Sequence, residues 1–243
     1  MKPSANFIWF CCLLLLACSK SDDSEIQVDM SSDEIIAKKI LFIGNSHTQY
    51  NGGLDLHLRG FTSDAEIPTL ITAQAISGFT LEDHLNLPAT LDLIASEAWD
   101  IIVLQENTSR AAYEPSQMLE SIEAFKTLFG QSGSEVYLFQ PWAYENMPEM
   151  NALLTNVYNQ AVTTSGFKLL SVGSLWVQFH SQQSLSLYND DGVHPNLLGT
   201  YLNAAIFYKK FFGATDLDTA NYNATLDLEQ ATIVKTFVSS LSL

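Results

Sequence analysis

The sequence predicts an α/β protein with three layers, α/β/α, built on a five-stranded parallel sheet. From Ile35 onward, short apolar runs alternate with longer amphipathic segments, which is typical of successive βαβ units. The chain has 243 residues, of which 47% are hydrophobic, so it can supply the core of one α/β domain of ordinary size.

Short apolar runs rich in β-branched residues are the expected strands. They cover Lys39–Gly44, Pro68–Ile76, Asp100–Leu104, Glu135–Gln140 and Lys168–Val172. Because parallel strands need a crossover between them, we expect the intervening segments to be helices that cross with a right hand.

The segments between these runs carry helical periodicity and helix-end signals. Thr80 or Asp83 can cap the second helix, Pro115 suits a first helical turn, and Gly130 and Gly166 stand where helices should end. The expected helices are Leu54–Asp64, Leu81–Ala98, Pro115–Gly130, Pro148–Ser165, Pro195–Phe212 and Leu226–Leu241.

The first part of the chain is typical of an export signal. Residues 1–17 contain an apolar run, Phe7–Ala17, that is too short to span a membrane. The run ends in Leu-Leu-Ala-Cys, which resembles the lipobox of bacterial lipoproteins and makes Cys18 the lipid-modified residue. The alternative is a plain signal peptide or an anchor that happens to contain Cys18.

Residues 18–36 are polar and acidic, and we expect a tether between a lipid anchor and a folded domain at 37–243. An acidic stretch behind the lipid cysteine also resembles the surface-export signal of Bacteroidota lipoproteins. We therefore expect an exported protein, anchored to the outer membrane or cell surface only through Cys18. All three cysteines lie at or before position 18, so the domain has no disulfide.

The charge balance restricts the partners. With 27 acidic and 11 basic residues, the net charge is −16, so the basic surface of a nucleic-acid-binding protein is missing. The same negative field disfavours anionic membranes and anionic substrates. A neutral small molecule or glycan ester is the expected ligand.

A strand-to-helix turn at Gly44-Asn45-Ser46 supplies the candidate nucleophile. Such a turn holds a side chain at the carboxyl edge of the sheet, where open α/β sheets bind ligands. The first N–H groups of the following helix point toward whatever lies above Ser46. The alternative is that Ser46 only caps the helix and Gly44 only permits the turn.

A base and its orienting acid occur near the other end of the chain. Asp191 and His194 are three residues apart, with Gly192 to allow a tight turn between them. This loop can hold the carboxylate against one imidazole nitrogen while the other nitrogen faces Ser46, as in a serine triad.

Together these segments resemble the first and last sequence blocks of the SGNH (GDSL-like) hydrolase superfamily, Gly44-Asn45-Ser46 and Asp191-Gly192-Val193-His194-Pro195. Ser77-Gly78 and Gln105-Glu106-Asn107-Thr108 stand where its middle blocks fall. The resemblance implies a flavodoxin-like sheet and a triad of Ser46, Asp191 and His194, with no cofactor. It also implies an oxyanion hole formed by the N–H groups of Ser46 and Gly78 and the side chain of Asn107.

The chain departs from that pattern in two blocks. Asn45 replaces the usual aspartate of block one, while Gln105 replaces the glycine and Thr108 the second aspartate position of block three. If the loop is shifted, Gln105 would supply the amide donor instead of Asn107. The Leu-Gln-Glu run and the Gly-Asn-Ser block are similar to a Bacteroidota branch of the superfamily, which fits the lipobox.

Other side chains complete the expected site. His47 can line the pocket, and Trp142 and Tyr144 can form a wall for a sugar or acyl group, unless both are core residues.

Three further histidines, His57, His84 and His180, have no partner at triad spacing, and we expect them at the surface or at helix ends. Neither HExxH nor a cysteine-histidine cluster occurs, so the sequence does not indicate a metal site.

The function that these observations predict is a serine esterase that removes acetyl or similar groups from a carbohydrate through an acyl-enzyme. A lipase, phospholipase or thioesterase is an alternative within the same chemistry. A glycan-binding lipoprotein that has lost turnover is the second alternative.

Overall fold

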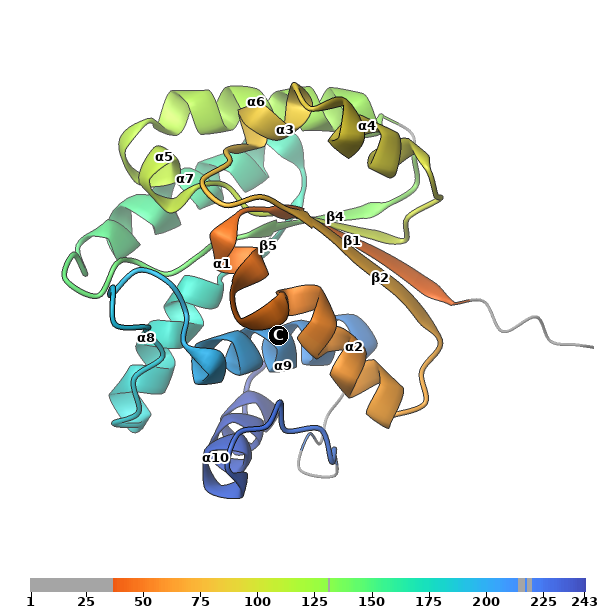
Figure 1. Ribbon diagram of the computed structural model, residues 1–243. Coiled ribbons are helices and arrows are strands. Elements are labelled where there is room, and N and C mark those ends of the chain that lie inside the picture. The colour runs from red at the N-terminus through yellow and green to blue at the C-terminus, as the bar shows by residue number, and fades with distance from the viewer. Residues whose placement is uncertain (1–36, 131, 214–216, 218–219) are drawn as a thin grey trace, which may run out of the picture. The chain divides into compact units, whose positions relative to one another are not determined.

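The computed structural model describes residues 37–130, 132–213, 217 and 220–243. The predicted signal peptide at 1–17 and the whole of the predicted tether at 18–36, including the lipidation site Cys18, lie outside these residues. The predicted fold is confirmed: the described part of the chain forms one five-stranded, parallel sheet between two layers of helices, in the order β2-β1-β3-β4-β5 (Figure 1).

The strands agree closely with the apolar runs of the sequence. They are β1 (Lys38–Gly44), β2 (Thr69–Ala75), β3 (Ile101–Leu104), β4 (Glu135–Phe139) and β5 (Lys168–Leu170). Strand β1 lies between β2 and β3, and from Ile40 onward it is buried on both faces, as its continuous apolar sequence predicts. Its end pairs with the ends of both neighbours, so the carboxyl ends of β1, β2 and β3 form one edge.

Helices cover both faces of the sheet. The helical elements are α1 (Ser46–Gln49), the 3₁₀ turn η1 (Tyr50–Gly52), α2 (Leu54–Asp64), α3 (Leu81–Leu85), α4 (Pro88–Ala95), α5 (Thr108–Tyr113), α6 (Pro115–Phe129), α7 (Met150–Ser165), α8 (Val172–Gln182), α9 (Leu197–Phe212) and α10 (Leu228–Ser239). Helices α3 to α7 lie on one side, and α2, α8, α9 and α10 on the other (Figure 1). Among the described residues, no helix combines the length and apolar character needed to cross a membrane.

The core is divided by the sheet. In β1, Ile40 and Phe42 point into the layer that contains α9, whereas Leu41 and Ile43 point into the layer that contains α6 and α7. This alternation is the period-two pattern of a strand, and it fixes the register of β1 because a slip by one residue would exchange the two faces.

One predicted helix was wrong in detail, and two helices were not predicted. The predicted helix Leu81–Ala98 is interrupted before Pro88, where Leu87 is extended, because proline lacks an N–H group and disfavours a helical residue before it. The short helix α5 was not expected. Helix α8 was missed as well, although its buried residues Trp176 and Phe179 have helical spacing, because the last predicted strand was extended to Val172.

Candidate active site

Ser46 lies at the tight turn that the sequence predicts. Strand β1 ends at Gly44, Asn45 is the extended N-cap of α1, and its side-chain oxygen accepts a hydrogen bond from the His47 N–H at 3.1 Å. Ser46 is the first helical residue and is 9% exposed. A Cβ atom at Gly44 would lie 2.7 Å from Gln105 Oε1, so the turn has no room for a larger residue there.

The structure brings Ser46, His194 and Asp191 into one hydrogen-bonded chain. Ser46 Oγ lies 2.9 Å from His194 Nε2, and His194 Nδ1 lies 2.6 Å from Asp191 Oδ2. A carboxylate can only accept, so the imidazole donates from Nδ1 and its Nε2 is left to accept from the serine hydroxyl. This is the tautomer that a serine nucleophile requires.

Asp191 is held by its own loop. Its Oδ1 accepts hydrogen bonds from the N–H groups of Val193 and His194, each at 2.9 Å, and Gly192 supplies the left-handed turn with φ +65°. Partial burial acts to raise the pKa of Asp191, but the His194 ring and the two N–H groups outweigh it and lower the pKa to about 2. The carboxylate is therefore ionised at neutral pH.

Two residues that the sequence analysis missed hold the histidine. The Tyr50 ring stacks on the His194 ring with centroids 4.3 Å apart and an interplanar angle of 9°. Asn51 donates from Nδ2 to the Pro195 carbonyl at 3.0 Å and to Thr200 Oγ1 at 2.8 Å. The available signal was the position of Tyr50, four residues after Ser46 and thus about one helical turn away.

His47 and Trp142 are buried behind the nucleophile. We expected His47 to line the pocket, but it is 6% exposed and its ring packs against Trp142 at 4.8 Å. Burial lowers the pKa of His47 to about 3, and the charge of nearby His194 acts in the same direction. Trp142 is 1% exposed, stacks on Trp176 at 3.9 Å, and donates to the Val193 carbonyl at 3.0 Å. Trp142 therefore supports the histidine loop from inside the core.

Gly78 lies in an exposed turn after β2, with φ +79°. The neighbouring carbonyl of Phe79 accepts a hydrogen bond from Asn45 Nδ2 at 3.0 Å. The turn at Ser77-Gly78 is thus attached directly to the turn that carries Ser46.

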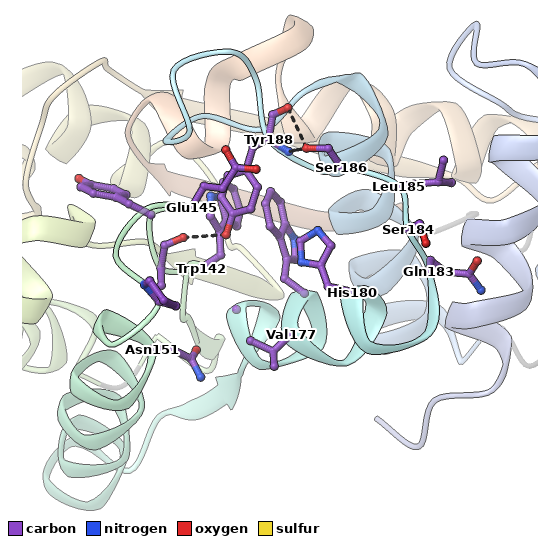
Figure 2. A pocket seen from close by; sticks show the side chains of 15 residues that line it. Trp142, Glu145, Asn151, Val177, His180, Gln183, Ser184, Leu185, Ser186 and Tyr188 are labelled. Carbon is purple, nitrogen blue, oxygen red and sulfur yellow. Dashed lines mark hydrogen bonds between the residues drawn. The ribbon is translucent and has the colours of Figure 1, made fainter.

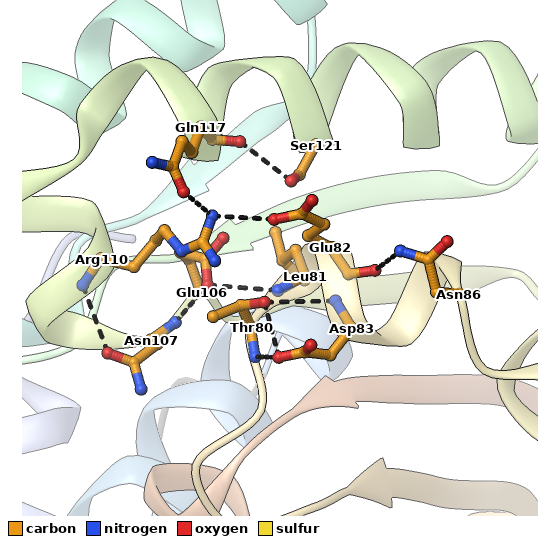
Figure 3. Close-up of polar contacts among 10 residues, drawn as sticks. All are labelled: Thr80, Leu81, Glu82, Asp83, Asn86, Glu106, Asn107, Arg110, Gln117 and Ser121. Carbon is orange, nitrogen blue, oxygen red and sulfur yellow. Dashed lines mark hydrogen bonds and ion pairs between the residues drawn. The ribbon is translucent and has the colours of Figure 1, made fainter.

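Asn107 is the N-cap of α5. Its Oδ1 accepts from the N–H groups of Ser109 at 3.0 Å and Arg110 at 3.3 Å. Figure 3 shows its amide nitrogen pointing away from this network. Within the described part of the chain, the Asn107 amide hydrogens have no partner and are available to a ligand.

Gln105, the alternative donor, has both amide hydrogens occupied. Its Nε2 donates to Asn45 Oδ1 at 3.0 Å and to the Glu106 carbonyl at 2.7 Å. Its Oε1 accepts from the Asn45 N–H at 3.0 Å and from Thr48 Oγ1 at 2.9 Å. This fully bonded, buried amide braces the nucleophile turn and has no hydrogen left for an oxyanion.

Glu106 links the two loops that carry the remaining donor candidates. Its Oε1 accepts from the N–H groups of Leu81 at 3.2 Å and Asn107 at 2.6 Å (Figure 3), and its side chain is buried. Its Oε2 has no hydrogen-bond partner among the described residues. Burial raises the pKa of Glu106 to about 7, although the two N–H groups and the charge of Arg110 oppose the shift.

His57 is buried within α2, contrary to the expectation of a surface or helix-end position. His84 and His180 lie in the last turns of α3 and α8, as expected, although His84 is buried. His57 contacts the Tyr222 hydroxyl at 2.8 Å and the Asn51 carbonyl at 2.9 Å. His84 contacts Thr90 Oγ1 at 3.0 Å and the Gly44 carbonyl at 2.8 Å, so it supports the end of β1. Each is buried because both ring nitrogens find a partner inside the protein.

A cavity of about 460 Å³ lies beside the triad loop, between the segment after β4, helix α8 and the segment after α8 (Figure 2). Trp142 and Tyr144 contribute to its lining, whereas the three triad residues do not. The Tyr144 hydroxyl is bonded to Ser109 Oγ at 2.8 Å. The expected aromatic wall therefore belongs to a cavity next to the nucleophile and not to one directly over it.

No metal site is evident in the described part of the chain, where no group of three or more His, Cys, Asp or Glu residues is placed to hold an ion.

In sequence, the chain matches no protein-family model and no curated protein. In structure, it is similar to a candidate SGNH hydrolase from Slackia heliotrinireducens, with 25% identity, a TM-score of 0.61, and coverage of 72% of this chain and 98% of the other. A DUF4886 family protein from Bacteroides uniformis has 17% identity and a TM-score of 0.67, covering 84% and 94%. An acetyl xylan esterase from Geobacillus stearothermophilus has 18% identity and a TM-score of 0.55, covering 72% and 96%. The chain therefore has the three-layer α/β fold of the SGNH hydrolases, with its serine, histidine and aspartate joined at the carboxyl edge of the sheet.

Proposed function

We propose that this protein is a serine esterase that hydrolyses carboxylic esters through an acyl-enzyme. The observation that carries the proposal is the connected chain from Ser46 Oγ to His194 and Asp191, at 2.9 and 2.6 Å. Ser46 attacks the ester carbonyl carbon while His194 Nε2 takes the hydroxyl proton. The same proton then passes to the leaving alcohol, and a water activated by His194 releases the acid.

The N–H groups of Ser46 and Gly78 and the amide of Asn107 are the proposed oxyanion donors. Support comes from the attachment of the Gly78 turn to Asn45 and from the unoccupied amide hydrogens of Asn107. Removing one such donor typically costs on the order of 100- to 1000-fold in kcat.

Within the esterases, a carbohydrate ester is the proposed substrate, with removal of an acetyl or similar short acyl group. The net charge of −16 favours a neutral substrate, and two of the structural neighbours are described as acetyl xylan esterases. A lipase, phospholipase or thioesterase remains the alternative that shares this chemistry. A glycan-binding protein without turnover is disfavoured by the complete hydrogen-bonded triad.

The test is reaction of the purified domain with a fluorophosphonate probe, together with hydrolysis of 4-nitrophenyl esters of increasing acyl length. We expect labelling and acetate hydrolysis in the wild type, with loss of both in Ser46→Ala and His194→Ala. Ser63→Ala, at an exposed serine on α2, is the matched control. A wild type that neither labels nor hydrolyses above the Ser46→Ala variant would refute the esterase proposal, and a preference for long acyl chains would favour a lipase.

We also propose that Cys18 carries a lipid that anchors the protein to the outer membrane or cell surface. The proposal is supported by the apolar run and lipobox-like Leu-Leu-Ala-Cys segment before the acidic tether. Metabolic incorporation of a palmitate analogue should depend on Cys18 and be lost in Cys18→Ser. Equal incorporation in both proteins would contradict it.

A further inference from the structure

The cavity beside the triad loop contains polar groups that the protein itself does not use. Among the described residues, the side chains of Glu145, His180 and Gln183 have no hydrogen-bond partner, although all three line the cavity. They come from three different segments: the segment after β4, helix α8 and the loop after α8 (Figure 2). An acceptor, an imidazole and an amide are thus free to bind a ligand rich in hydroxyl groups.

Apolar and aromatic surface lies beside these polar groups. The Tyr188 and His180 rings are parallel at 5.9 Å, and Tyr188 also meets Trp176 edge-on at 5.0 Å. Val177, on helix α8, is 55% exposed. A surface of flat rings with adjacent hydrogen-bonding groups matches a sugar ring, which has apolar C–H faces and a polar rim.

The charge of the lining restricts the ligand further. Glu145 is the one residue with a formal charge among those lining the cavity, and no lysine or arginine is present there. Because a carboxylate repels anions and no cation compensates it, a phosphorylated or uronic ligand is disfavoured. A neutral oligosaccharide fits all of these features.

The cavity is continuous with the backbone that carries the triad. The Glu145 N–H donates to the Gly192 carbonyl at 2.8 Å, next to Asp191. Tyr188 is bridged to Pro195, the residue after His194. A ligand bound in the cavity therefore lies beside two segments that are bonded to the loop carrying Asp191 and His194.

We propose that this cavity is a binding subsite for an unmodified sugar unit of a neutral oligosaccharide whose ester is attacked at Ser46. The proposal rests on the proposed esterase function, because it assigns the cavity to the alcohol part of the same substrate. Binding energy from a remote part of a substrate mainly changes KM when it acts equally on the ground state and the transition state.

The experiment compares an acetylated xylo-oligosaccharide with 4-nitrophenyl acetate, which is too small to occupy both places. Val177→Trp should fill the cavity, and His180→Ala should remove a polar contact. In each variant we expect the ratio of kcat/KM for the oligosaccharide to that for the small ester to fall about tenfold, through KM. Gln178→Ala, at an exposed position of α8 outside the cavity lining, is the control and should leave both substrates unchanged.

A separate binding measurement distinguishes failure of the subsite from failure of the function. Calorimetric titration of Ser46→Ala with the deacetylated oligosaccharide should show binding that Val177→Trp abolishes in the same background. Ester hydrolysis with no change of ratio in the cavity variants would overturn the subsite and leave the esterase intact. Cavity-dependent binding without any hydrolysis would overturn the esterase and retain the subsite as that of a glycan-binding protein. Preference for a cationic amino sugar over the neutral oligosaccharide would overturn the ligand class.

Discussion

Replacement of the buried carboxylate Glu106 by an amide should change how the stability of the fold depends on pH. In the folded protein, Glu106 is 1% exposed and its pKa is raised from 4.5 to about 7. Glutamine has the same shape and keeps the oxygen that accepts from Leu81 and Asn107, but it cannot ionise. Glu106→Gln therefore removes the titration while preserving the link between the two loops.

The sign of this pH dependence follows from the direction in which the pKa of Glu106 is shifted. Because the folded state holds the proton more tightly than the unfolded chain, the stabilising contribution is complete below the unfolded pKa of 4.5. It is lost as the pH rises through about 7, where the buried group must ionise. Between pH 5 and 8 the loss is about 2 to 3 kcal/mol, as expected for a pKa shift of this size.

Urea unfolding followed by tryptophan fluorescence, at several pH values from 5 to 8, measures this directly. The free energy of unfolding of Glu106→Gln minus that of the wild type should rise by about 2 to 3 kcal/mol over this range, because the other titrating groups cancel in the difference. Glu120→Gln, at an exposed position on α6, is the control and should give a flat difference. A flat difference for Glu106→Gln as well would refute the reasoning.

Three further changes test the site. Tyr50→Leu should lower kcat about 2- to 30-fold, because a stacked ring stabilises the protonated histidine by about 0.5 to 2 kcal/mol. Tyr50→Phe should retain kcat, and equal rates in the two variants would contradict this. Asn107→Ser should keep the helix cap, and therefore the Tm, but lower kcat for 4-nitrophenyl acetate about 100- to 1000-fold, because it removes the amide donor. A wild-type kcat would show that Asn107 is not part of the oxyanion hole. Gly44→Ala should destabilise the protein by about 1 to 3 kcal/mol in urea unfolding, because the added Cβ would clash with Gln105. Unchanged stability would show that the turn has room for the added methyl group.

The features that the sequence predicted well are governed by local rules. The strand that ends at Gly44 and the loop from Asp191 to His194 are each specified within a few residues, by an apolar run, a glycine and a cap. The loop from Asp191 to His194 follows α8 and not a strand, so its meeting with Ser46 did not follow from the sheet topology. The position of the turn at Gly44 did, because parallel topology places the carboxyl ends of the strands together. For the same reason, the fold class and the strand positions could be predicted from the chain alone.

The features that could not be predicted from the sequence depend on partners far away in the chain. Tyr50 stacks on the ring of His194, which is 144 positions later in the chain. Glu106 accepts a hydrogen bond from the N–H group of Leu81, which is 25 positions earlier. For Tyr50 the local pattern offers only its one-turn spacing from Ser46, and for Glu106 it offers no indication of the partner. His84 lies at a helix end, as one of its two expected positions, but its burial could not be predicted, since it depends on Gly44 and Thr90 occupying both of its ring nitrogens.

The two departures from the superfamily pattern, Asn45 and Gln105, form one structural unit. Gln105 accepts from the Asn45 N–H and donates to Asn45 Oδ1, so the backbone and the side chain of Asn45 are both held by one amide. Asn45 then uses its own Nδ2 to bind the Phe79 carbonyl, which an aspartate could not do because a carboxylate has no hydrogen to donate. A glycine at 105 would remove both bonds to Asn45 and leave a void beside Gly44. The pair therefore connects block one to block three through Gln105 and to block two through Phe79, and it does so with neutral groups in a buried place where a charge would be costly.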